Sequence, residues 1–303
     1  MERPTLRQLE YFLAVVEHLS FRKAAEASHV SQPSLSAQIA QLEAKLGLEL
    51  FERDRRGVRV TAAGEALAPA AREALDATAT FGQLASSLGA PLTGPLRMGV
   101  IPTIGPYLLP RALPAVRKAH PDLQLFLRED RTGRLLELLD AGELDLLLLA
   151  IDLDLGPVET LPLFSDPFVL AIPKSDALCK ADGSEAATLA DLDGRDVLLL
   201  DEGHCLREQT LPLCDAGGAE ERGGFRASSL ATICQMVAAD LGVTLLPELA
   251  VERELAAAPE LCAVPFGADG PSRQVGLAWR SRSPRAEEFR ALGQTLAAAY
   301  AAS

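Results

Sequence analysis

Two cysteines that lie close together in the sequence are the residues best suited to carry out chemistry. Cys205 follows His204 directly and precedes Arg207 by two positions. Cations beside a cysteine favour its thiolate, the form that attacks peroxides and disulfides. Cys214 lies nine positions further on, where it can resolve an oxidised Cys205 by forming a disulfide with it. Because the neighbouring Asp215 opposes a second negative charge at Cys214, we expect Cys205 to react first.

A disulfide between these two cysteines requires the backbone between them to rearrange. On a continuous helix, nine residues would separate the two Cα atoms by about 13.5 Å, and an extended chain would separate them further. A disulfide needs a Cα separation of roughly 4.4–6.8 Å. Pro212 lacks a backbone donor and biases Leu211 away from helical geometry. We therefore expect oxidation to refold residues near 203–224 and to change how the larger domains of two copies pair.

The other three cysteines show neither paired spacing nor basic neighbours. Cys234 falls on the apolar face of a predicted helix over 229–239 and is expected in the core, while Cys179 and Cys262 are expected to be unreactive. No CxxC or HxxxH spacing predicts a zinc site or a thioredoxin-like enzyme, and no glycine-rich phosphate loop is present. We predict no metal and no cofactor.

Composition and charge limit the class of protein. A length of 303 residues suggests about two domains. The net charge of −13 is unevenly distributed, because residues 1–62 carry a net charge of +1 and the remaining 241 residues carry −14. An acidic body with a near-neutral head is compatible with DNA binding through the head alone. With no secretory leader and no apolar run longer than Leu144–Ile151, we expect a cytoplasmic protein without membrane contact, in which thiols stay reduced.

The first 62 residues have the pattern of a winged helix-turn-helix. Apolar residues recur at helical spacing over 5–18, and two further helices are expected over 21–27 and from Ser31 to about Lys45. The turn between the second and third helices is only three residues long. Residues 51–61 then read as a β-hairpin with a basic tip, which is the wing.

The remaining chain divides into a helix and an α/β region. Between 62 and 88, residues Leu67, Ala74, Phe81 and Leu88 recur every seven positions, which favours a dimerising helix over one packed on its own domain. Beyond a Gly/Pro hinge, strand and helix patterns alternate, as in open α/β sheets. We expect three domains: a winged helix-turn-helix at 1–62, a linker helix at 63–90 and a larger domain at 91–303. The expected strands are 96–100, 123–128, 144–150, 168–172, 197–200, 243–246 and 275–279, and the expected helices lie near 107–119, 133–141, 229–239 and 284–299.

These residues resemble a known family. Phe21–Ser36, Leu50–Arg53 and Thr61–Gly64 are similar to the head of LysR-type transcriptional regulators, and Leu96–Thr103 is similar to the start of their effector domain. The resemblance implies a multidomain fold with a winged helix-turn-helix, a long linker helix and a two-lobed α/β effector domain like periplasmic binding proteins.

Within that family the cysteine segment resembles the hydrogen peroxide-sensing members, although Glu208 and Ser228 depart from their pattern. The resemblance implies a transcriptional activator, not an enzyme, that works as a homodimer or homotetramer on double-stranded DNA. It also implies hydrogen peroxide as the signal, RNA polymerase as a partner and a thiol reductant such as glutaredoxin or thioredoxin. The residues expected around the Cys205 sulfur are Thr103, Thr132, His204, Arg207 and Arg273.

DNA readout needs donors and acceptors on a helix that fits the major groove. The third helix offers Ser31, Gln32, Ser34, Ser36 and Gln38, and the resemblance places Gln32, Pro33 and Ser34 against base edges and phosphates. Arginines are expected to contact phosphates, which positions the protein without specifying sequence. They are Arg7, Arg53, Arg55, Arg56 and Arg59, and each could instead belong to a solvated face.

Two alternatives remain open at this point. The chain could be a LysR-type regulator that binds a small organic anion between its lobes, with Thr103 at a helix start and the cysteines incidental. It could also be a thiol peroxidase joined to a DNA-binding head. Sustained turnover of peroxide would favour the peroxidase, and a response to metabolites would favour the anion-binding regulator.

Overall fold

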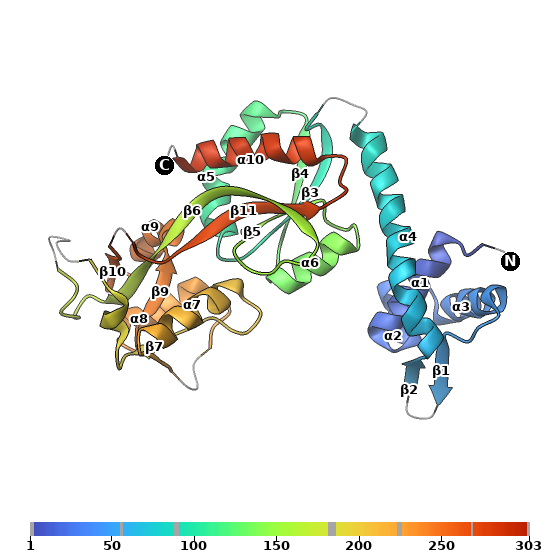
Figure 1. The fold of residues 1–303 in the computed structure, drawn as a ribbon, viewed down its shortest axis with the longest axis horizontal. Helices are drawn as coiled ribbons and strands as arrows, with labels where there is room; N and C mark the ends of the chain where they lie inside the picture. The colour runs from blue at the N-terminus through green and yellow to red at the C-terminus, as the bar shows by residue number, and fades with distance from the viewer. Residues whose placement is uncertain are drawn as a thin grey trace. The chain divides into compact units, whose positions relative to one another are not determined.

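The computed structural model describes residues 3–54, 57–87, 91–180, 186–222, 226–267 and 269–301. The chain forms two compact units, Met1–Ser86 and Ser87–Ser303, each shown in Figure 1. This division places nearly all of the expected linker helix with the N-terminal unit. Among the described residues, no helix combines the length and apolar character that crossing a bilayer demands.

The N-terminal unit opens with three helices: α1 (Leu6–His18), α2 (Phe21–Ala27) and α3 (Gln32–Leu46). Each begins after a hydroxyl residue, Thr5, Ser20 or Ser31, whose side chain accepts a hydrogen bond from the backbone three positions later. The hairpin β1 (Phe51–Asp54) and β2 (Gly57–Val60) follows. The ring of Phe51 contacts those of Phe12 and Phe21, which fixes the hairpin to the helices. The predicted winged helix-turn-helix is confirmed.

Helix α4 (Ala62–Ser87) continues from the hairpin and contains Pro69. Its first turns pack closely on the head, because a Cβ on Gly64 would lie 2.6 Å from the Leu50 carbonyl oxygen. Ala68 and Ala71 are buried there, whereas Phe81 is 74% exposed. The start of the helix is therefore packed on its own unit, and dimerisation through its later turns stays a prediction. Leu88 lies outside the described residues.

The C-terminal unit is built on a seven-stranded sheet in the order β10-β6-β11-β5-β3-β4, with β9 also paired to β6. Strand β3 runs parallel to β4 and β5, and the other pairs are antiparallel. The 16-residue β6 pairs with β11 along its first part and with β9 and β10 along its second part (Figure 1). One strand thus joins two lobes. The strands are β3 (Gly94–Val100), β4 (Leu123–Glu129), β5 (Leu146–Ala150), β6 (Val158–Pro173), β9 (Thr244–Pro247), β10 (Leu261–Pro265) and β11 (Ser272–Arg280).

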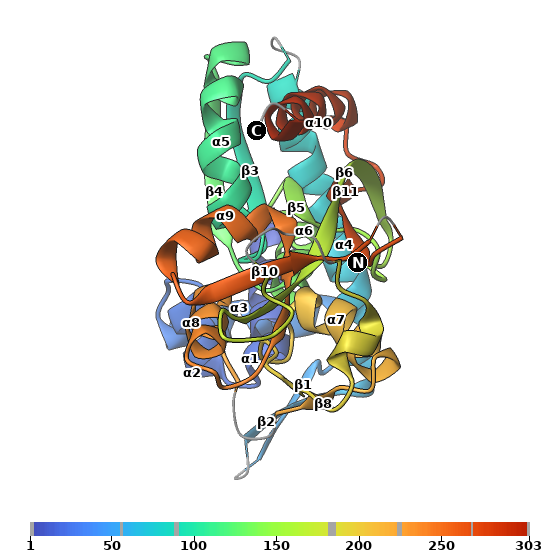
Figure 2. The same ribbon diagram turned by 90° about the vertical axis from the view of Figure 1, so that its left-hand side faces the viewer.

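Helices cover the sheet, and α10 packs beside α5 at one end of the unit (Figure 2). The predicted two-lobed α/β fold is confirmed, but the sequence patterns missed the helices over 205–216 and 248–257, strand β10, and the short elements at 189–192 and 220–221. The helices are α5 (Gly105–Ala119), α6 (Thr132–Asp140), α7 (Cys205–Ala216), α8 (Leu230–Ala238), α9 (Glu248–Ala257) and α10 (Ala286–Ala301). A 3-10 turn, η1 (Leu189–Leu192), and two short strands, β7 (Asp196–Val197) and β8 (Glu220–Glu221), complete the second lobe.

Candidate redox site

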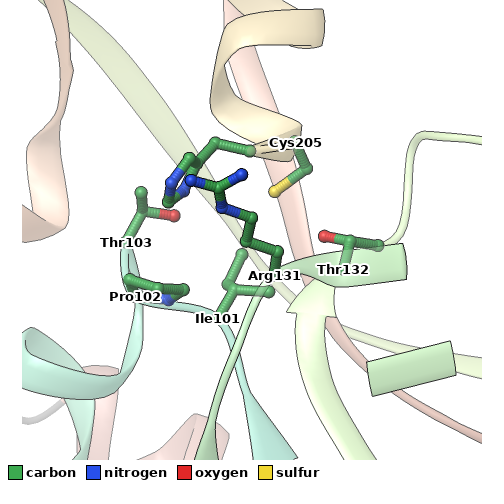
Figure 3. A pocket seen from close by; sticks show the side chains of 7 residues that line it. Ile101, Pro102, Thr103, Arg131, Thr132 and Cys205 are labelled. Carbon is green, nitrogen blue, oxygen red and sulfur yellow. The ribbon is translucent and has the colours of Figure 1, made fainter. Parts of the chain in front are cut away.

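Three separate segments meet around the sulfur of Cys205 and form what we call the sulfur pocket (Figure 3). The first segment follows the end of β3, the second begins α6 and the third begins α7. Because β3 and β4 are parallel neighbours, the segments that leave their carboxyl ends emerge at the same edge of the sheet. The space between the side chains does not hold a water-sized sphere. The pocket is lined by Ile101, Pro102, Thr103, Arg131, Thr132, His204 and Cys205.

Cys205 is the first residue of α7 and is only 4% exposed. Burial raises the pKa of its thiol, and the charge of Arg273 and the hydroxyl of Thr132 oppose that increase. Glu208 and Asp152 raise the pKa further. The position at a helix N-terminus adds a partial positive charge that favours a thiolate. The pocket therefore shields the sulfur from bulk solvent while supplying groups that stabilise negative charge on it.

The cation of the site is Arg273, which lies on β11 and is fully buried. Its Nη2 lies 2.8 Å from a carboxylate oxygen of Asp166, and neither side chain has exposed surface. Its Nη1 donates to Thr103 Oγ1 at 2.8 Å and its Nη2 donates to the Thr103 carbonyl at 3.0 Å. Since Asp166 also accepts from the backbone N–H of Leu249, the ion pair has partners on several sides. This network fixes the Thr103 side of the pocket.

Thr132 forms the opposite side of the sulfur pocket. Its hydroxyl points toward the Cys205 sulfur (Figure 3) and has no hydrogen-bond partner of ordinary geometry among the described residues. Its interaction with the thiol lowers the pKa of Cys205. A buried hydroxyl that is free of other partners can donate to a thiolate or to an oxygen that approaches the sulfur.

Replacing Thr132 with valine is expected to slow peroxide oxidation of Cys205 by roughly fivefold to tenfold, the value of one hydrogen bond of about 1 kcal/mol. The sign follows from the interaction: without the hydroxyl, the pKa of Cys205 increases and the thiolate fraction falls. Stopped-flow measurement of the oxidation rate checks this. Thr132→Ser keeps the hydroxyl and serves as the control, and an unchanged rate in the valine variant would remove Thr132 from the site.

His204 lines the pocket but does not supply positive charge there. It is buried, and burial together with the nearby Arg131 lowers its pKa, although Asp201 opposes this. Its Nε2 is buried without a hydrogen-bond partner among the described residues. The lowered pKa argues against the prediction that this histidine acts as a cation beside Cys205, while its place in the pocket is as predicted. A neutral imidazole can instead accept or donate a hydrogen bond inside the pocket.

Arg207 does not face the pocket, which corrects a second prediction. Its guanidinium binds both carboxylate oxygens of Glu221 at 2.9 and 2.7 Å, and this pairing lowers the pKa of Glu221. Residues two apart on a helix point to different sides, so Arg207 cannot share the direction of Cys205. Its role is to hold α7 against β8.

The side chain of Arg131 extends into the group of residues that line the pocket (Figure 3). Its Nη1 donates to the Glu202 carbonyl at 2.9 Å, and its side chain is about half exposed. Gly203 has a φ of +84°, and a Cβ there would meet the Arg131 side chain at 3.3 Å. The glycine thus leaves room for the Arg131 side chain.

Cys214 lies on the same helix as Cys205 and is 2% exposed. Burial and the adjacent Asp215 raise the pKa of its thiol to about 12. Because α7 is continuous between them, the nine intervening steps separate the two cysteines by about 13.5 Å along the axis. The two sulfurs cannot bond in this fold.

Helix α7 continues through Pro212, although the sequence favoured a break near Leu211. Pro212 cannot donate to the Glu208 carbonyl four positions earlier, and a proline inside a helix costs about 3 kcal/mol relative to alanine. The helix is held at its ends and side by other contacts. Gly217 packs against η1, and Gln209 donates to Asp152 at 2.6 Å. The segment between the cysteines is therefore a helix with a weak point that tertiary contacts hold in place.

The remaining cysteines correct another prediction. Cys179 and Cys262 form a disulfide, whereas Cys205, Cys214 and Cys234 are free thiols. Their separation of 83 residues gave no spacing signal, and the strand that carries Cys262 was itself not predicted. Cys234 is in the core on α8, where it was expected.

The N-terminal unit presents part of the predicted DNA-binding set. Gln32, Pro33 and Ser34 are exposed on the first turn of α3, while the Ser31 hydroxyl caps that turn by accepting from the Ser34 N–H. Ser36 is half-buried. The exposed residues form a short surface at a helix N-terminus, where base edges and phosphates can be reached.

The other residues predicted to contact DNA differ in their surroundings: some bind side chains of the same unit, some are exposed, and others lie outside the described residues. Gln38 accepts from Gln8 at 3.3 Å and so joins α3 to α1. Arg7 is exposed, but its Nε donates to the Tyr11 hydroxyl at 2.7 Å. Arg59 is exposed on β2. The side chain of Arg53 and all of Arg55 and Arg56 lie outside what the structure describes.

Comparison with known proteins agrees with this architecture. The LysR substrate binding domain matches residues 89–301, and the bacterial regulatory helix-turn-helix of the LysR family matches residues 6–65. A probable hydrogen peroxide-inducible genes activator of Streptomyces viridosporus is 44% identical over 295 residues, covering 97% of this chain and 94% of that protein. The DNA-binding transcriptional dual regulator OxyR of Escherichia coli strain K12 is 41% identical, covering 97% and 95%.

Solved structures are similar over almost the whole chain. A full-length OxyR variant from Pseudomonas aeruginosa has a TM-score of 0.73 at 34% identity, covering 98% of this chain and 95% of that one. A Corynebacterium glutamicum OxyR variant with bound hydrogen peroxide has a TM-score of 0.67 at 38% identity, covering 99% and 94%. With a winged helix-turn-helix head, a two-lobed α/β unit and these matches, the chain belongs to the LysR family of bacterial transcriptional regulators.

Proposed function

We propose that the chain is a hydrogen peroxide-responsive transcriptional activator that binds DNA through its winged helix-turn-helix and is switched by a Cys205–Cys214 disulfide. Four observations support this: a buried cysteine at a helix start, hydroxyl groups and one buried arginine around it, a second thiol on the same helix, and close similarity to OxyR proteins. The placement of Cys205 in the sulfur pocket carries the proposal.

The chemistry follows from the groups that face the sulfur. The Cys205 thiolate attacks one oxygen of hydrogen peroxide, the O–O bond breaks, and hydroxide leaves as Cys205 becomes a sulfenic acid. Hydrogen bonds from Thr132 and from the Arg273–Thr103 network stabilise the sulfur and the leaving oxygen. The Cys214 thiol then attacks the sulfenic sulfur and releases water, so two thiols and one peroxide give one disulfide and two waters.

The disulfide stores the signal as a change of fold. Closing a gap of about 13.5 Å between the cysteines requires α7 to unwind. Unwinding breaks the Arg207–Glu221 pair and the Gln209–Asp152 contact, so it also frees the surfaces that α7 covered. A dithiol reductant of the glutaredoxin or thioredoxin kind restores the thiols by exchange. We propose that oxidation is one stoichiometric event per cycle and not sustained enzymatic turnover.

The compartment, the oligomeric state and the partner at the promoter belong to the same proposal. The chain acts in the cytoplasm as a homodimer or homotetramer and contacts RNA polymerase at the promoter. The half-exposed apolar face of α4, which includes Phe81, supports pairing of two copies. The closed sulfur pocket supports a very small signal molecule over a larger organic anion.

An operator selected from a random-sequence DNA pool tests the function. Hydrogen peroxide at one equivalent is expected to change the length or spacing of the nuclease footprint, and small carboxylate metabolites are expected to leave it unchanged. Gln32→Ala removes a base contact worth about 1–3 kcal/mol, so specific binding should weaken roughly 5- to 150-fold in both redox states. Since Gln32 is exposed, folding is expected to remain intact. A footprint that follows metabolites and ignores peroxide would favour the anion-binding regulator.

A further inference from the structure

The Cys179–Cys262 disulfide lies at an end of the sheet, away from the sulfur pocket. Cys262 is on β10, paired with Ile172 of β6. Strand β6 ends at Pro173, and Cys179 follows six residues later, so the chain turns back to bring it beside β10. The two Cα atoms are 6.0 Å apart. The disulfide thus joins the loop that follows β6 to β10, the terminal strand of the second lobe.

Other contacts hold these two positions together independently of the sulfur bond. Asp176 organises the turn before Cys179: its carboxylate accepts from the Leu178 N–H, and its carbonyl accepts from the Cys179 N–H, both at 3.0 Å. Arg195 binds the same carboxylate, and these hydrogen bonds and the ion pair lower the pKa of Asp176 even though burial opposes them. On the other side, the β6–β10 register fixes Cys262. Reduced thiols at these positions would therefore remain close enough to bond again.

The Cys179–Cys262 pair is more exposed to solvent than the cysteine pair on α7. Cys179 and Cys262 are both partly exposed. Cys205 and Cys214 are 4% and 2% exposed, and the pocket before Cys205 has no room for a water-sized sphere. Thiol–disulfide exchange needs the attacking sulfur to reach the bond in line. A bulky disulfide such as oxidised glutathione can meet that requirement at the outer pair and is excluded from the buried inner pair, and hydrogen peroxide is far smaller than such a disulfide.

We propose that Cys179 and Cys262 form a second redox couple, a clamp on the second lobe, which equilibrates with small-molecule thiols and disulfides of the glutathione kind. In the forward direction, a Cys179 or Cys262 thiolate attacks the small disulfide and releases one thiolate. The second cysteine then displaces the other, so one protein disulfide forms and one small disulfide is reduced to two thiols. The clamp does not depend on the peroxide switch and would exist without it.

The clamp has a consequence for the whole second lobe. The covalent loop between the two cysteines spans 83 positions and contains α7, α8, α9 and β9. Cross-linking a loop of this length restricts the unfolded chain and so stabilises the folded one. The segment that must unwind during peroxide sensing therefore lies inside a closed ring, which keeps the rest of the lobe folded while α7 rearranges.

Tryptic peptides make the test direct, because each of the five cysteines lies on its own peptide. Cleavage after lysine and arginine gives Ser175–Lys180 with Cys179 and Glu254–Arg273 with Cys262, and it separates Cys205 from Cys214 at Arg207. The full chain is first reduced and then placed in mixtures of reduced and oxidised glutathione. Free thiols are blocked with an alkylating reagent at set times before digestion and mass analysis.

The expected result is that Ser175–Lys180 becomes linked to Glu254–Arg273 at least tenfold faster than Cys205 or Cys214 reacts. One equivalent of hydrogen peroxide should reverse that order. Absence of the 179–262 link at every glutathione ratio would overturn the proposal. Glutathione attached to either cysteine without a link between them, or equal reaction of the α7 pair, would overturn it as well.

Thermal unfolding tests the clamp in the same protein. Oxidation by glutathione is expected to raise the midpoint by roughly 5–15 °C relative to the fully reduced chain. Cys179→Ser, Cys262→Ser and the double variant should each abolish this increase to the same extent, and Cys234→Ser, a buried free thiol, should retain it. The comparison of oxidised and reduced wild type stays informative if a serine variant folds poorly. Equal midpoints for the two wild-type forms would contradict the clamp.

Discussion

Cys205→Ser is expected to abolish the response to hydrogen peroxide and to slow peroxide consumption by the chain more than 100-fold. Serine keeps the size and the place at the start of α7, but its hydroxyl does not ionise near neutral pH and is a poor nucleophile toward peroxide. The buried setting gives the serine no substitute for a thiolate, since Arg273 and Thr132 can stabilise negative charge only where it forms. A footprint assay with and without peroxide, together with the stopped-flow rate, measures the loss.

Two variants separate the roles of the thiols. Cys214→Ser should still react with peroxide at nearly the wild-type rate, because its pKa of about 12 makes Cys214 a weak first nucleophile. The sulfenic acid at Cys205 would then accumulate, and a sulfenic acid-specific probe detects it. Cys234→Ser should behave as wild type in both assays. Retention of the peroxide response in Cys205→Ser would place the sensing step elsewhere.

Arg273→Met is expected to lower the free energy of unfolding by about 3–5 kcal/mol, the usual cost of removing one partner of a buried ion pair. Neither Arg273 nor Asp166 has exposed surface, so the remaining carboxylate would be left uncompensated in the interior. The substitution also removes two hydrogen bonds to Thr103. Urea denaturation of the full chain measures the loss, and the oxidation rate of Cys205 should fall because its stabilising cation is gone.

Matched variants distinguish this effect from a general loss of charge. Asp166→Asn added to Arg273→Met removes the unpaired anion and should recover part of the lost stability, so the two substitutions should not be additive. Arg290→Met breaks only exposed ion pairs, with Glu159 at 3.5 Å and with Glu287, and should cost about 1 kcal/mol or less. A loss for Arg273→Met no larger than that of Arg290→Met would show that the buried pair does not hold the pocket.

Local signals in the sequence predicted the head well, for physical reasons. The hydroxyl residues Thr5, Ser20 and Ser31 cap the three helices at the places where the sequence patterns begin, and these are interactions within a few residues of the chain. Most of strand β3 and all of β5 were also found, and the fully buried β5 reads as a continuous apolar run. Strand β6 was predicted only in its second part, because its first part alternates with polar residues and prolines.

The sulfur pocket was predictable only through family resemblance. Thr103, Thr132, Cys205 and Arg273 come from four distant segments, and no local pattern brings them together. The resemblance placed Thr103, Thr132 and Arg273 around the Cys205 sulfur, and the structure has both threonines at the pocket and Arg273 hydrogen-bonded behind Thr103. The prediction for Arg207 rested on its closeness to Cys205 in the sequence, and it failed because residues two apart on α7 point to different sides.

The Cys179–Cys262 bridge shows the limit of spacing arguments. A disulfide depends on proximity in the fold, and here the β6–β10 pairing and the Asp176 turn create that proximity. Neither feature has a sequence signal strong enough to predict the contact. The expected compartment and the lack of paired spacing both argued for free thiols at Cys179 and Cys262, and tertiary structure overrides them.

Sensing through Cys205 and Cys214 depends on the ability of helix α7 to unwind. Pro212 weakens it between the two cysteines, while Arg207–Glu221 and Gln209–Asp152 hold its outer side. Formation of the Cys205–Cys214 disulfide can then drive the unwinding of this one weak helix while the sheet stays folded. A rigid α7 would keep the two sulfurs apart whatever the oxidant.

Peptide mapping of the reduced wild-type chain after one equivalent of hydrogen peroxide tests that account most directly. Trypsin places Cys205 on Asp196–Arg207 and Cys214 on Glu208–Arg222, so a link between these two peptides reports the new bond without ambiguity. We predict that this link forms in most molecules and disappears on treatment with a dithiol. If Cys205 were instead found unoxidised, or joined to any other cysteine, the switch through α7 would be contradicted, although the DNA-binding head would remain as described.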